Sequence, residues 1–316
     1  MTWPARMPNA RNDGRLDVPI AMLVFNRPEQ TRRVFERVRI AQPRRLLVVA
    51  DGPRRGRAGE VELCSETREI FRFVDWDCDL RTNFAQENMG CRKRVATGLT
   101  WVFDNAEEAI ILEDDCLPDI SFFPFCQELL IRYRDDQRIM AISGDNFQFG
   151  KRRTSDSYYF SRYVHVWGWA SWRRAWRHYD DEIRFWPELR DGGWLQDVLG
   201  NRRAVAWWTR IYQDVHAGKM DTWDYQWQLA IWAQNGLVVL PNQNLVSNIG
   251  FTPQATHTDT ESPLAQLPTV PLDFPIRHPS CLIRDVNADT NTQENFYSPS
   301  LSRRIKRRLG RLAVYG

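Results

Sequence analysis

The chain has 316 residues, of which 43% are apolar and 26% are charged. This length and apolar content are sufficient to bury the core of one large domain or of two closely joined halves. The formal net charge is only +3, and six basic residues between Arg303 and Arg311 account for it, since removing them leaves −3. The near balance of acidic and basic residues in the rest of the chain excludes a nucleic-acid-binding protein. The basic residues near the C-terminus are a local feature with a local role.

The first half of the sequence alternates short β-rich runs with helical patterns. Pro28 suits the first turn of a helix, and apolar residues recur at helical spacing within residues 61–74 and 95–103. Strands that alternate with helices of this length indicate βαβ units, an α/β fold and a mainly parallel, Rossmann-like sheet. The expected strands cover residues 19–25, 45–50, 79–83, 109–112 and 139–143.

The second half has a different texture. Most of the fourteen tryptophans lie between residues 158 and 232, a segment that we expect to be helical and irregular, with a strand at 237–240 after it. Residues 259–300 are rich in Pro, Thr and Asp and have weak periodicity, which favours an extended wrapping segment. Residues 301–316 read as a basic amphipathic C-terminal helix, whose apolar side consists of Leu301, Ile305, Leu309 and Leu312.

No targeting or cross-linking signal stands out. Residues 1–17 are polar and contain two prolines, which predicts a disordered N-terminal arm rather than a signal peptide or membrane anchor. No stretch has the roughly 18 apolar residues of a transmembrane helix. The six cysteines form neither a C-x-x-C pair nor a zinc pattern. We therefore expect a cytoplasmic bacterial protein. Contact with the inner face of the plasma membrane would involve only residues 301–312.

Polar residues follow three of the expected strands. Phe25-Asn26-Arg27, Asp51 and Glu113-Asp114-Asp115 all stand at strand carboxyl ends, where parallel sheets bind their ligands. Three consecutive carboxylates repel one another, and a hard cation such as Mn²⁺ or Mg²⁺ relieves that repulsion. The triplet thus predicts a metal site that stabilises a departing diphosphate. A solvated acidic loop that caps a helix near Ser121 is the alternative.

The ordered set of motifs resembles a known family of enzymes. An apolar strand followed by Glu113-Asp114-Asp115 is similar to the E-D-D form of the D-x-D motif in the N-acetylglucosaminyltransferase I family and its bacterial family-2-like relatives, within the GT-A glycosyltransferases. The resemblance covers roughly residues 18–258. Its other matching segments are Ala21–Pro28, Val49–Gly52, Ile142–Asn146, Val166–Trp169 and Trp223-Asp224.

The resemblance implies a GT-A fold and an activity. Residues 18–258 would form the glycosyltransferase domain, with a nucleotide-sugar half over 18–150 and a Trp-rich acceptor half over 151–258. The implied reaction is inverting transfer of a hexosyl or N-acetylhexosaminyl group, with Mn²⁺ or Mg²⁺, from a nucleotide sugar to an acceptor hydroxyl. The family favours UDP, while GDP or another nucleotide stays open. A glycan or lipid-linked acceptor, as in bacterial surface polysaccharide synthesis, is our hypothesis.

Roles on the donor side follow from the same resemblance. Asp115 would bind the metal, Asp114 would lie near the ribose and Glu113 near the donor sugar. Arg27 would face the diphosphate, as guanidinium groups often do, although a surface residue at a helix start is the plain alternative. Asp51 would accept a hydrogen bond from the base, unless it only stabilises its turn.

Weaker assignments complete the donor and substrate site. Asn88 and Gly90 precede a helix and can approach the nucleotide through their backbone. Trp167, Gly168 and Trp169 match the family's glycine-aromatic segment, so we expect them near the substrate, whereas the helical spacing of Trp169 with Trp172 and Trp176 is typical of core packing. His257 is a candidate second metal ligand, as in several other GT-A enzymes, or a solvated loop histidine.

Asp224 is the expected general base, because direct displacement needs a carboxylate on the acceptor side to take the acceptor proton. Asp221, three residues earlier, is its rival, and either residue can instead be a helix cap or a surface acid. A glycoside hydrolase also uses two carboxylates but leaves the triplet unexplained. A non-catalytic carbohydrate-binding protein is a further alternative, and a nucleotidyltransferase would need a Gly-rich loop after the first strand, which this sequence lacks.

Overall fold

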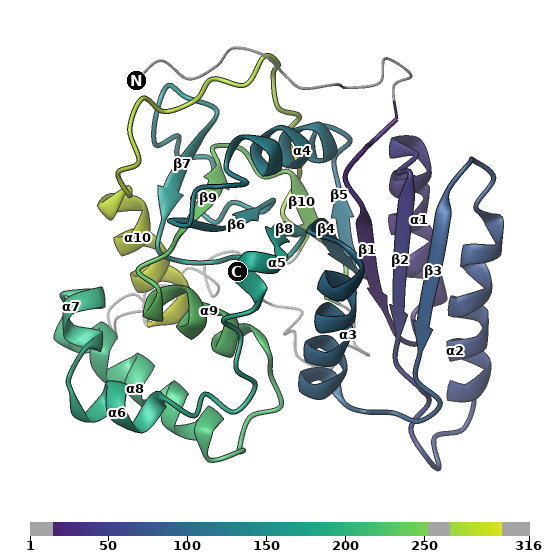
Figure 1. The fold of residues 1–316 in the computed structure, drawn as a ribbon, viewed down its shortest axis with the longest axis horizontal. Coiled ribbons are helices and arrows are strands. Elements are labelled where there is room, and N and C mark those ends of the chain that lie inside the picture. The colour runs from purple at the N-terminus through teal and green to yellow at the C-terminus, as the bar shows by residue number, and fades with distance from the viewer. Residues whose placement is uncertain (1–14, 252–265, 299–316) are drawn as a thin grey trace, which may run out of the picture.

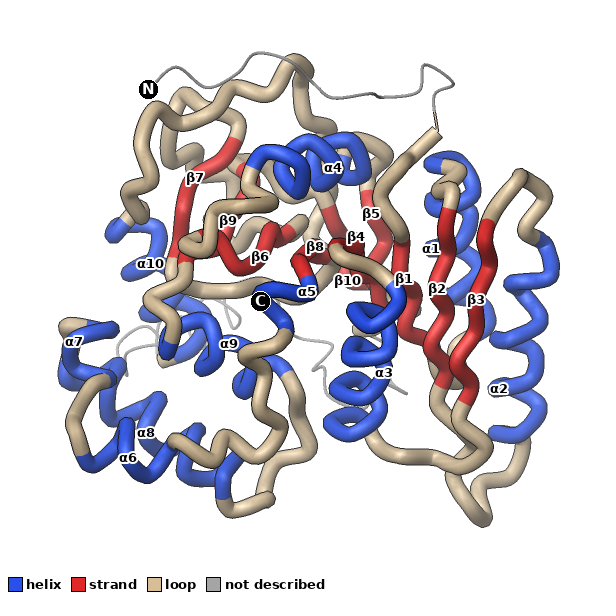
Figure 2. Tube along the Cα trace, in the orientation of Figure 1, coloured by secondary structure: helices blue, strands red, loops and turns tan. Residues whose placement is uncertain are grey.

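A computed structural model describes residues 15–251 and 266–298 (Figure 1). Its centre is an eight-stranded sheet in the order β3-β2-β1-β4-β8-β6-β9-β7. The neighbours β3, β2, β1 and β4 are parallel, β6 pairs in parallel with β9, and β8 and β7 run antiparallel to their neighbours. Figure 2 shows the strands as a central layer with helices around it. The expected α/β fold with a mainly parallel sheet is confirmed.

The nucleotide-sugar half expected from the sequence consists of regular strand–helix units. The strand order reverses between β1 and β4, because β2 and β3 lie on one side of β1 and β4 lies on the other. In open α/β sheets such a reversal opens a crevice at the strand carboxyl ends. The units are β1 (Ile20–Val24), α1 (Pro28–Ala41), β2 (Arg45–Ala50), α2 (Glu60–Glu69) with a 3₁₀ turn at Ile70–Phe73, β3 (Asp79–Phe84), α3 (Cys91–Asn105) and β4 (Glu108–Glu113).

Both faces of the sheet are covered, which explains why β1 and β2 are almost continuously apolar. Alternate residues point to opposite faces of a strand. Met22 therefore packs in the cluster that contains residues of α1 and of α4 (Phe122–Arg132), whereas Leu23 packs in the cluster that contains residues of α3 and α9 (Asp224–Ala233). The carboxyl ends of the strands are left between these two layers.

The tryptophan-rich segment contains two strands that the sequence pattern did not predict. β7 (Tyr158–Ser161) and β8 (Trp169–Trp172) belong to the central sheet, so the expectation of a purely helical and irregular segment is wrong. Both strands are buried on both faces, so their sequences show no alternation of apolar and polar residues. The remaining strands are β5 (Cys116–Pro118), β6 (Ile139–Ser143), β9 (Leu237–Pro241) and β10 (Val246–Asn248), of which β5 and β10 form a separate pair.

Short helices form the rest of this half, around a third cluster of buried aromatic residues. The C-terminal part of residues 259–300, expected to be extended, contains one more helix and a π turn. Gln293 explains the docking of this piece, since its side-chain oxygen accepts hydrogen bonds from the Tyr163 hydroxyl (2.7 Å) and the Trp208 indole (2.8 Å). The helices are α5 (Arg173–Trp176), α6 (Trp186–Asp191), α7 (Leu195–Leu199), α8 (Arg202–His216), α10 (Val286–Thr292) and the π turn Gln293–Tyr297.

Most of the expected N-terminal arm and all of the expected helix over residues 301–316 lie outside the described residues. Within the described ranges, no helix combines the length and the apolar character needed to cross a membrane.

Candidate functional site

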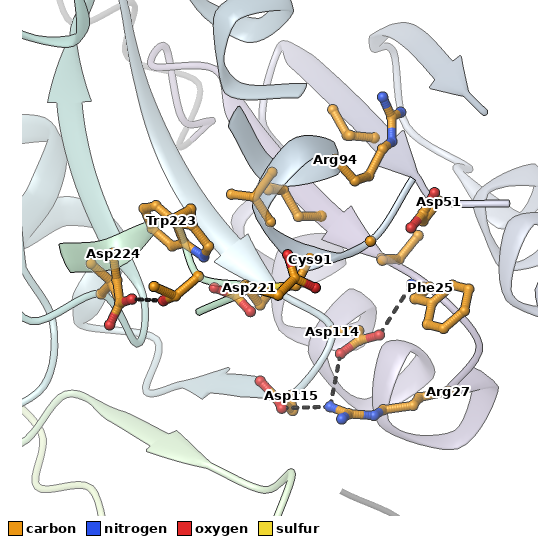
Figure 3. Close-up of a pocket in the computed structure, with 18 of the residues that line it drawn as sticks. Phe25, Arg27, Asp51, Cys91, Arg94, Asp114, Asp115, Asp221, Trp223 and Asp224 are labelled. Atoms are coloured by element: carbon orange, nitrogen blue, oxygen red, sulfur yellow. Dashed lines mark hydrogen bonds and ion pairs between the residues drawn. The ribbon is translucent and has the colours of Figure 1, made fainter. Parts of the chain in front are cut away.

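A cavity of about 750 Å³ opens at the carboxyl ends of β1, β2 and β4. Residues that follow these strands form one wall, and residues 220–225, ahead of and within α9, form part of the opposite wall (Figure 3). The cavity therefore lies at the point between β1 and β4 where the strand order reverses, as the rule for open α/β sheets predicts. The sequence candidates that line it are Arg27, Asp51, Asn88, Gly90, Glu113, Asp114, Asp115, Trp167, Asp221 and Asp224.

Arg27 lies against the acidic triplet. Its Nη1 is 2.6 Å from Asp115 Oδ2 and 3.4 Å from Asp114 Oδ1. Asp114 also accepts a hydrogen bond from the backbone N–H of Phe25 (3.2 Å), which ties the end of β1 to the end of β4. A single guanidinium thus faces two carboxylates, and Figure 3 shows the three side chains grouped at one end of the pocket.

Arg27 relieves only part of the repulsion within the triplet. Burial, followed by repulsion from Asp115 and Asp114, raises the pKa of Glu113, and burial followed by Asp115 raises that of Asp114. A hard divalent cation favours carboxylate oxygens and would relieve the same repulsion without protons. Among the described residues, no group of three His, Cys, Asp or Glu side chains is arranged to hold a metal alone. A cation held by Asp115 would therefore need further ligands, such as the oxygens of a diphosphate.

The backbone of Gly250 lies directly against Asp115. A Cβ at this glycine would be 2.0 Å from Asp115 Oδ2 and 2.7 Å from its Cγ. The N–H of Ile249 donates to the Asp115 carbonyl (2.8 Å), and the Gly250 N–H donates to Asn248 Oδ1 (2.8 Å). The segment after β10 therefore fixes where the Asp115 carboxylate can point.

We expect Gly250→Ala to displace the Asp115 side chain. Overpacking of this kind typically costs about 1–3 kcal/mol, and the affinity for UDP with Mn²⁺ should fall at least about tenfold, since about 1.4 kcal/mol corresponds to tenfold. Calorimetric titration checks the affinity. Gly236→Ala is the matched control, because its Cβ would meet Met140 Cγ at 2.6 Å away from the cavity lining. Equal nucleotide affinity in both variants would contradict the assigned role of Gly250.

Asp51 holds two loops together at the other end of the cavity. Its Oδ1 accepts from the N–H groups of Gly52 (2.8 Å) and Met89 (2.9 Å), and its Oδ2 accepts from Asn88 Nδ2 (2.9 Å). Burial raises the pKa of Asp51, against the opposing effect of these backbone donors. The turn-stabilising alternative for Asp51 is therefore realised, and the carboxylate still lines the cavity. Gly90 follows with a φ of 80°, a backbone conformation that favours glycine.

The sequence reasoning missed two charged residues of the lining, Arg94 and Arg54. Arg94 is buried, and its Nε donates to the Ala50 carbonyl (3.2 Å) at the end of β2. Its signal was an arginine on the apolar side of α3, four residues before the buried Gly98. Arg54 lies over the ring of Phe25 at 5.5 Å and pairs with Glu60. These side chains flank the region near Asp51.

The two late aspartates have different roles. Asp224 is the first residue of α9 and faces the cavity. Asp221 Oδ1 accepts a hydrogen bond from the backbone N–H of Arg92 (3.0 Å), in the first turn of α3. Asp221 is therefore engaged as a cap of α3, and the choice between Asp224 and Asp221 as the base stays a prediction.

The glycine-aromatic segment is only partly at the site. Trp167 lines the cavity and packs edge-on against Phe251, with ring centroids 5.6 Å apart. Trp169 is fully buried and outside the lining, so the expectation that it lies at the substrate does not hold. The reason is the geometry of the strand, because Trp169 begins β8 and its side chain packs among the aromatic residues of the core. Gly168 is also outside the lining; its φ is 71°, and a Cβ there would be 2.7 Å from Val246 Cγ2.

His257 lies outside the described residues, so its assignment as a metal ligand stays a prediction.

A buried acid, Asp145, follows β6, and a buried histidine, His165, follows β7. Asp145 and His165 are 3.7 Å apart (Oδ2 to Nδ1), and within the described part of the chain neither side chain has a hydrogen-bond partner. Burial raises the pKa of Asp145 well above its ordinary range and lowers that of His165 to about 3. His165 stacks on Phe147, which packs against Trp167 of the cavity wall.

Asp145→Asn is expected to stabilise the fold by an amount that grows with pH. A raised pKa means that the folded state binds the proton more tightly, so the contribution of Asp145 to stability falls once the pH exceeds about 3.9, its value in unfolded chains. The advantage of the neutral amide should increase by up to about 1.4 kcal/mol per pH unit. Urea unfolding at pH 5 and pH 7 measures it, with the exposed Asp197→Asn as control. A pH-independent difference would argue against a neutral buried acid.

Several solved structures align with parts of the chain at low sequence identity. No family model and no curated protein sequence matches the chain. A GalNAc-T7 structure with UDP, GalNAc and Mn²⁺ aligns over 73% of this chain and 43% of the GalNAc-T7 chain, with 11% identity and a TM-score of 0.43. The chain thus spans less than half of the length of that protein. The mannosyltransferase PcManGT from Pyrobaculum calidifontis, in complex with GDP-Man and Mn²⁺, aligns over 70% of this chain and 69% of its own, with 13% identity and a TM-score of 0.39. A cytidylyltransferase from Leptospira borgpetersenii aligns over 56% and 71%, with 11% identity and a TM-score of 0.32.

Proposed function

We propose that the chain is a metal-dependent, inverting glycosyltransferase of the GT-A type, with a UDP-sugar as its first candidate donor. One observation carries the proposal: a single cavity is lined by the loops after β1, β2 and β4, by the acidic triplet, and on the opposite wall by Asp224. A nucleotide sugar needs all of these in one place. The order of the motifs, and their resemblance to the N-acetylglucosaminyltransferase I family, supports a hexosyl or N-acetylhexosaminyl donor.

On the donor side, the nucleoside would lie near Asp51, Asn88 and Arg94, and the diphosphate near Arg27. Arg27 pairs with Asp115 and Asp114 in the structure, so it can offer further N–H donors to phosphate oxygens. A Mn²⁺ or Mg²⁺ ion held by Asp115 would supply Lewis-acid stabilisation of the negative charge on the diphosphate. Glu113 lines the same cavity and is close enough to Asp115 and Asp224 to feel their charges, so the donor sugar would bind near it.

On the acceptor side, Asp224 would accept the proton of the attacking hydroxyl while the new glycosidic bond forms and the bond to the diphosphate breaks. The attack comes from the side opposite the leaving group, so the configuration at the anomeric carbon inverts in one displacement. Met220 and Tyr225, which are near Asp224 in the sequence, and Trp167 would contact the acceptor or the sugar, because all three line the cavity.

The acceptor class is also a proposal. A glycan or lipid-linked acceptor in bacterial surface polysaccharide synthesis agrees with the basic, amphipathic sequence of residues 301–312, which would bring a cytoplasmic enzyme to the inner membrane face. Sedimentation with anionic lipid vesicles measures this association. Transfer only to proteins or to small soluble molecules would contradict it.

The function is tested by calorimetry followed by a donor screen. UDP, GDP and CDP are titrated with and without Mn²⁺, and nucleotide sugars are then assayed for release of nucleoside diphosphate. Mn²⁺-dependent binding and release support a glycosyltransferase. Hydrolysis of glycosides without nucleotide or metal would indicate a glycoside hydrolase, and binding of sugars without turnover a carbohydrate-binding protein. Formation of a nucleotide sugar from CTP or UTP would indicate a nucleotidyltransferase.

A further inference from the structure

The segment that carries Asp224 contains a second polar side chain directed at it. Thr222 lies two residues before Asp224, and its Oγ1 donates a hydrogen bond to Asp224 Oδ1, the contact drawn as a dashed line at Asp224 in Figure 3. Both residues line the cavity. A hydroxyl that donates to one carboxylate oxygen fixes the rotation of the carboxylate and leaves the second oxygen in a defined direction.

Thr222 is itself held in place by its backbone. Its carbonyl accepts a hydrogen bond from Gln226 Nε2 (2.6 Å), and the Gln226 side chain is fully buried in the first turn of α9. Asp221, the preceding residue, accepts from the N–H of Arg92 at the start of α3. The Arg92 side chain in turn binds Asp181 through Oδ1 (2.8 Å) and the carbonyl oxygen (2.7 Å). The bonds of Thr222 and Asp221 thus tie the segment to α9 and to the start of α3.

Aromatic packing supports the same segment from behind. Trp223, between Thr222 and Asp224, is 4% exposed and stacks on Trp169, with ring centroids 5.8 Å apart and an interplanar angle of 25°. Trp169 also packs on Trp176 and Trp227, with ring centroids 6.4 Å and 5.8 Å away. The backbone under Asp224 therefore has little freedom.

We infer that Thr222 is a positioning residue that orients the Asp224 carboxylate toward the acceptor hydroxyl. The inference rests on the proposed function, since it needs Asp224 to be the base. It differs from a structural role because Thr222 Oγ1 contacts Asp224, whereas the fold around it is held by the Thr222 carbonyl, Asp221 and Trp223. Loss of the hydroxyl should leave the fold and the nucleotide site intact and slow only the proton-accepting step.

The test compares Thr222→Val with Thr222→Ser. The assay is release of UDP, with water as the acceptor, from whichever of UDP-glucose, UDP-galactose and UDP-N-acetylglucosamine the wild type hydrolyses fastest. Valine keeps the branched shape and removes the donor, so kcat should fall about 10- to 100-fold, the cost of small misplacement in an active site. The donor KM and the Kd for UDP with Mn²⁺ should stay within about twofold. Serine keeps the donor and should restore most of kcat.

Controls separate the possible failures. Thr97→Val removes a hydroxyl that donates to the Lys93 carbonyl (2.8 Å) at an exposed position of α3, and it should leave kcat unchanged. If Thr222→Val does not fold, Thr222→Ala is measured against the same serine variant. Wild-type kcat in the variant without the hydroxyl, together with an inactive Asp224→Asn, would overturn the inference alone. No hydrolysis of any nucleotide sugar by the wild type would overturn the proposed function and the inference with it.

Discussion

Replacing Asp115 with alanine is expected to abolish Mn²⁺-dependent binding of UDP and to reduce turnover about a thousandfold. The reason is that a bound metal stabilises the charge of the transition state by several kcal/mol, and this stabilisation would be lost. The Asp115 carboxylate contacts both Arg27 and Gly250. It follows β4, which with β1 forms the pair of strands between which the strand order reverses. Without it, Asp114 and Glu113 remain, but neither lies in this position.

The measurement is a titration of UDP with and without Mn²⁺ for wild type and variant, alongside thermal unfolding. Asp104→Ala is the matched control, since Asp104 is an exposed acid of α3 outside the cavity lining. If Asp115→Ala still binds UDP more tightly with Mn²⁺ than without it, the metal is held by other residues and the assignment of Asp115 is wrong. Lost binding with an unchanged unfolding temperature would assign the effect to the site rather than to the fold.

The regular half of the fold could be predicted from sequence because its signals are local. The strand β2 has the bounds expected for it, and α1 begins at Pro28, where proline fits the first helical turn. The strands β7 and β8 could not be found in the same way. Trp169–Trp172 is buried on both faces, so it lacks alternation, and its spacing with Trp176 imitates a helix. Membership in the sheet comes from pairing with β4 and β6, which are distant in sequence.

The candidate site was predictable where residues follow strands. Arg27, Asp51 and the acidic triplet meet at one edge because parallel strands end together. Contacts between distant segments were not predictable. Nothing in the sequence indicates that Asp221 caps α3 or that Gly250 lies against Asp115, since these contacts join residues more than 120 positions apart. Arg94 gave a local signal, a charge on the apolar side of its helix, that points only to burial and not to a ligand.

Asp224→Asn is expected to lower kcat about 100- to 10,000-fold, the usual contribution of a general base, with the Kd for UDP and Mn²⁺ unchanged. Asparagine keeps the shape and can still accept the Thr222 hydrogen bond, but it cannot take the acceptor proton. The metal site should stay intact, because Asp224 lies apart from the Arg27–Asp115 pair in Figure 3.

Asp221→Asn is the matched comparison, since it changes the neighbouring acid in the same way. Its amide oxygen can still accept from the Arg92 N–H, so kcat should stay within a few-fold of wild type, whereas Asp221→Ala removes the cap and should cost about 1 kcal/mol of stability. The two asparagine variants therefore separate a base from a cap at positions three residues apart. A large loss of kcat in Asp221→Asn, with Asp224→Asn near wild type, would exchange the two roles, because only the residue that accepts the proton depends on its charge for turnover.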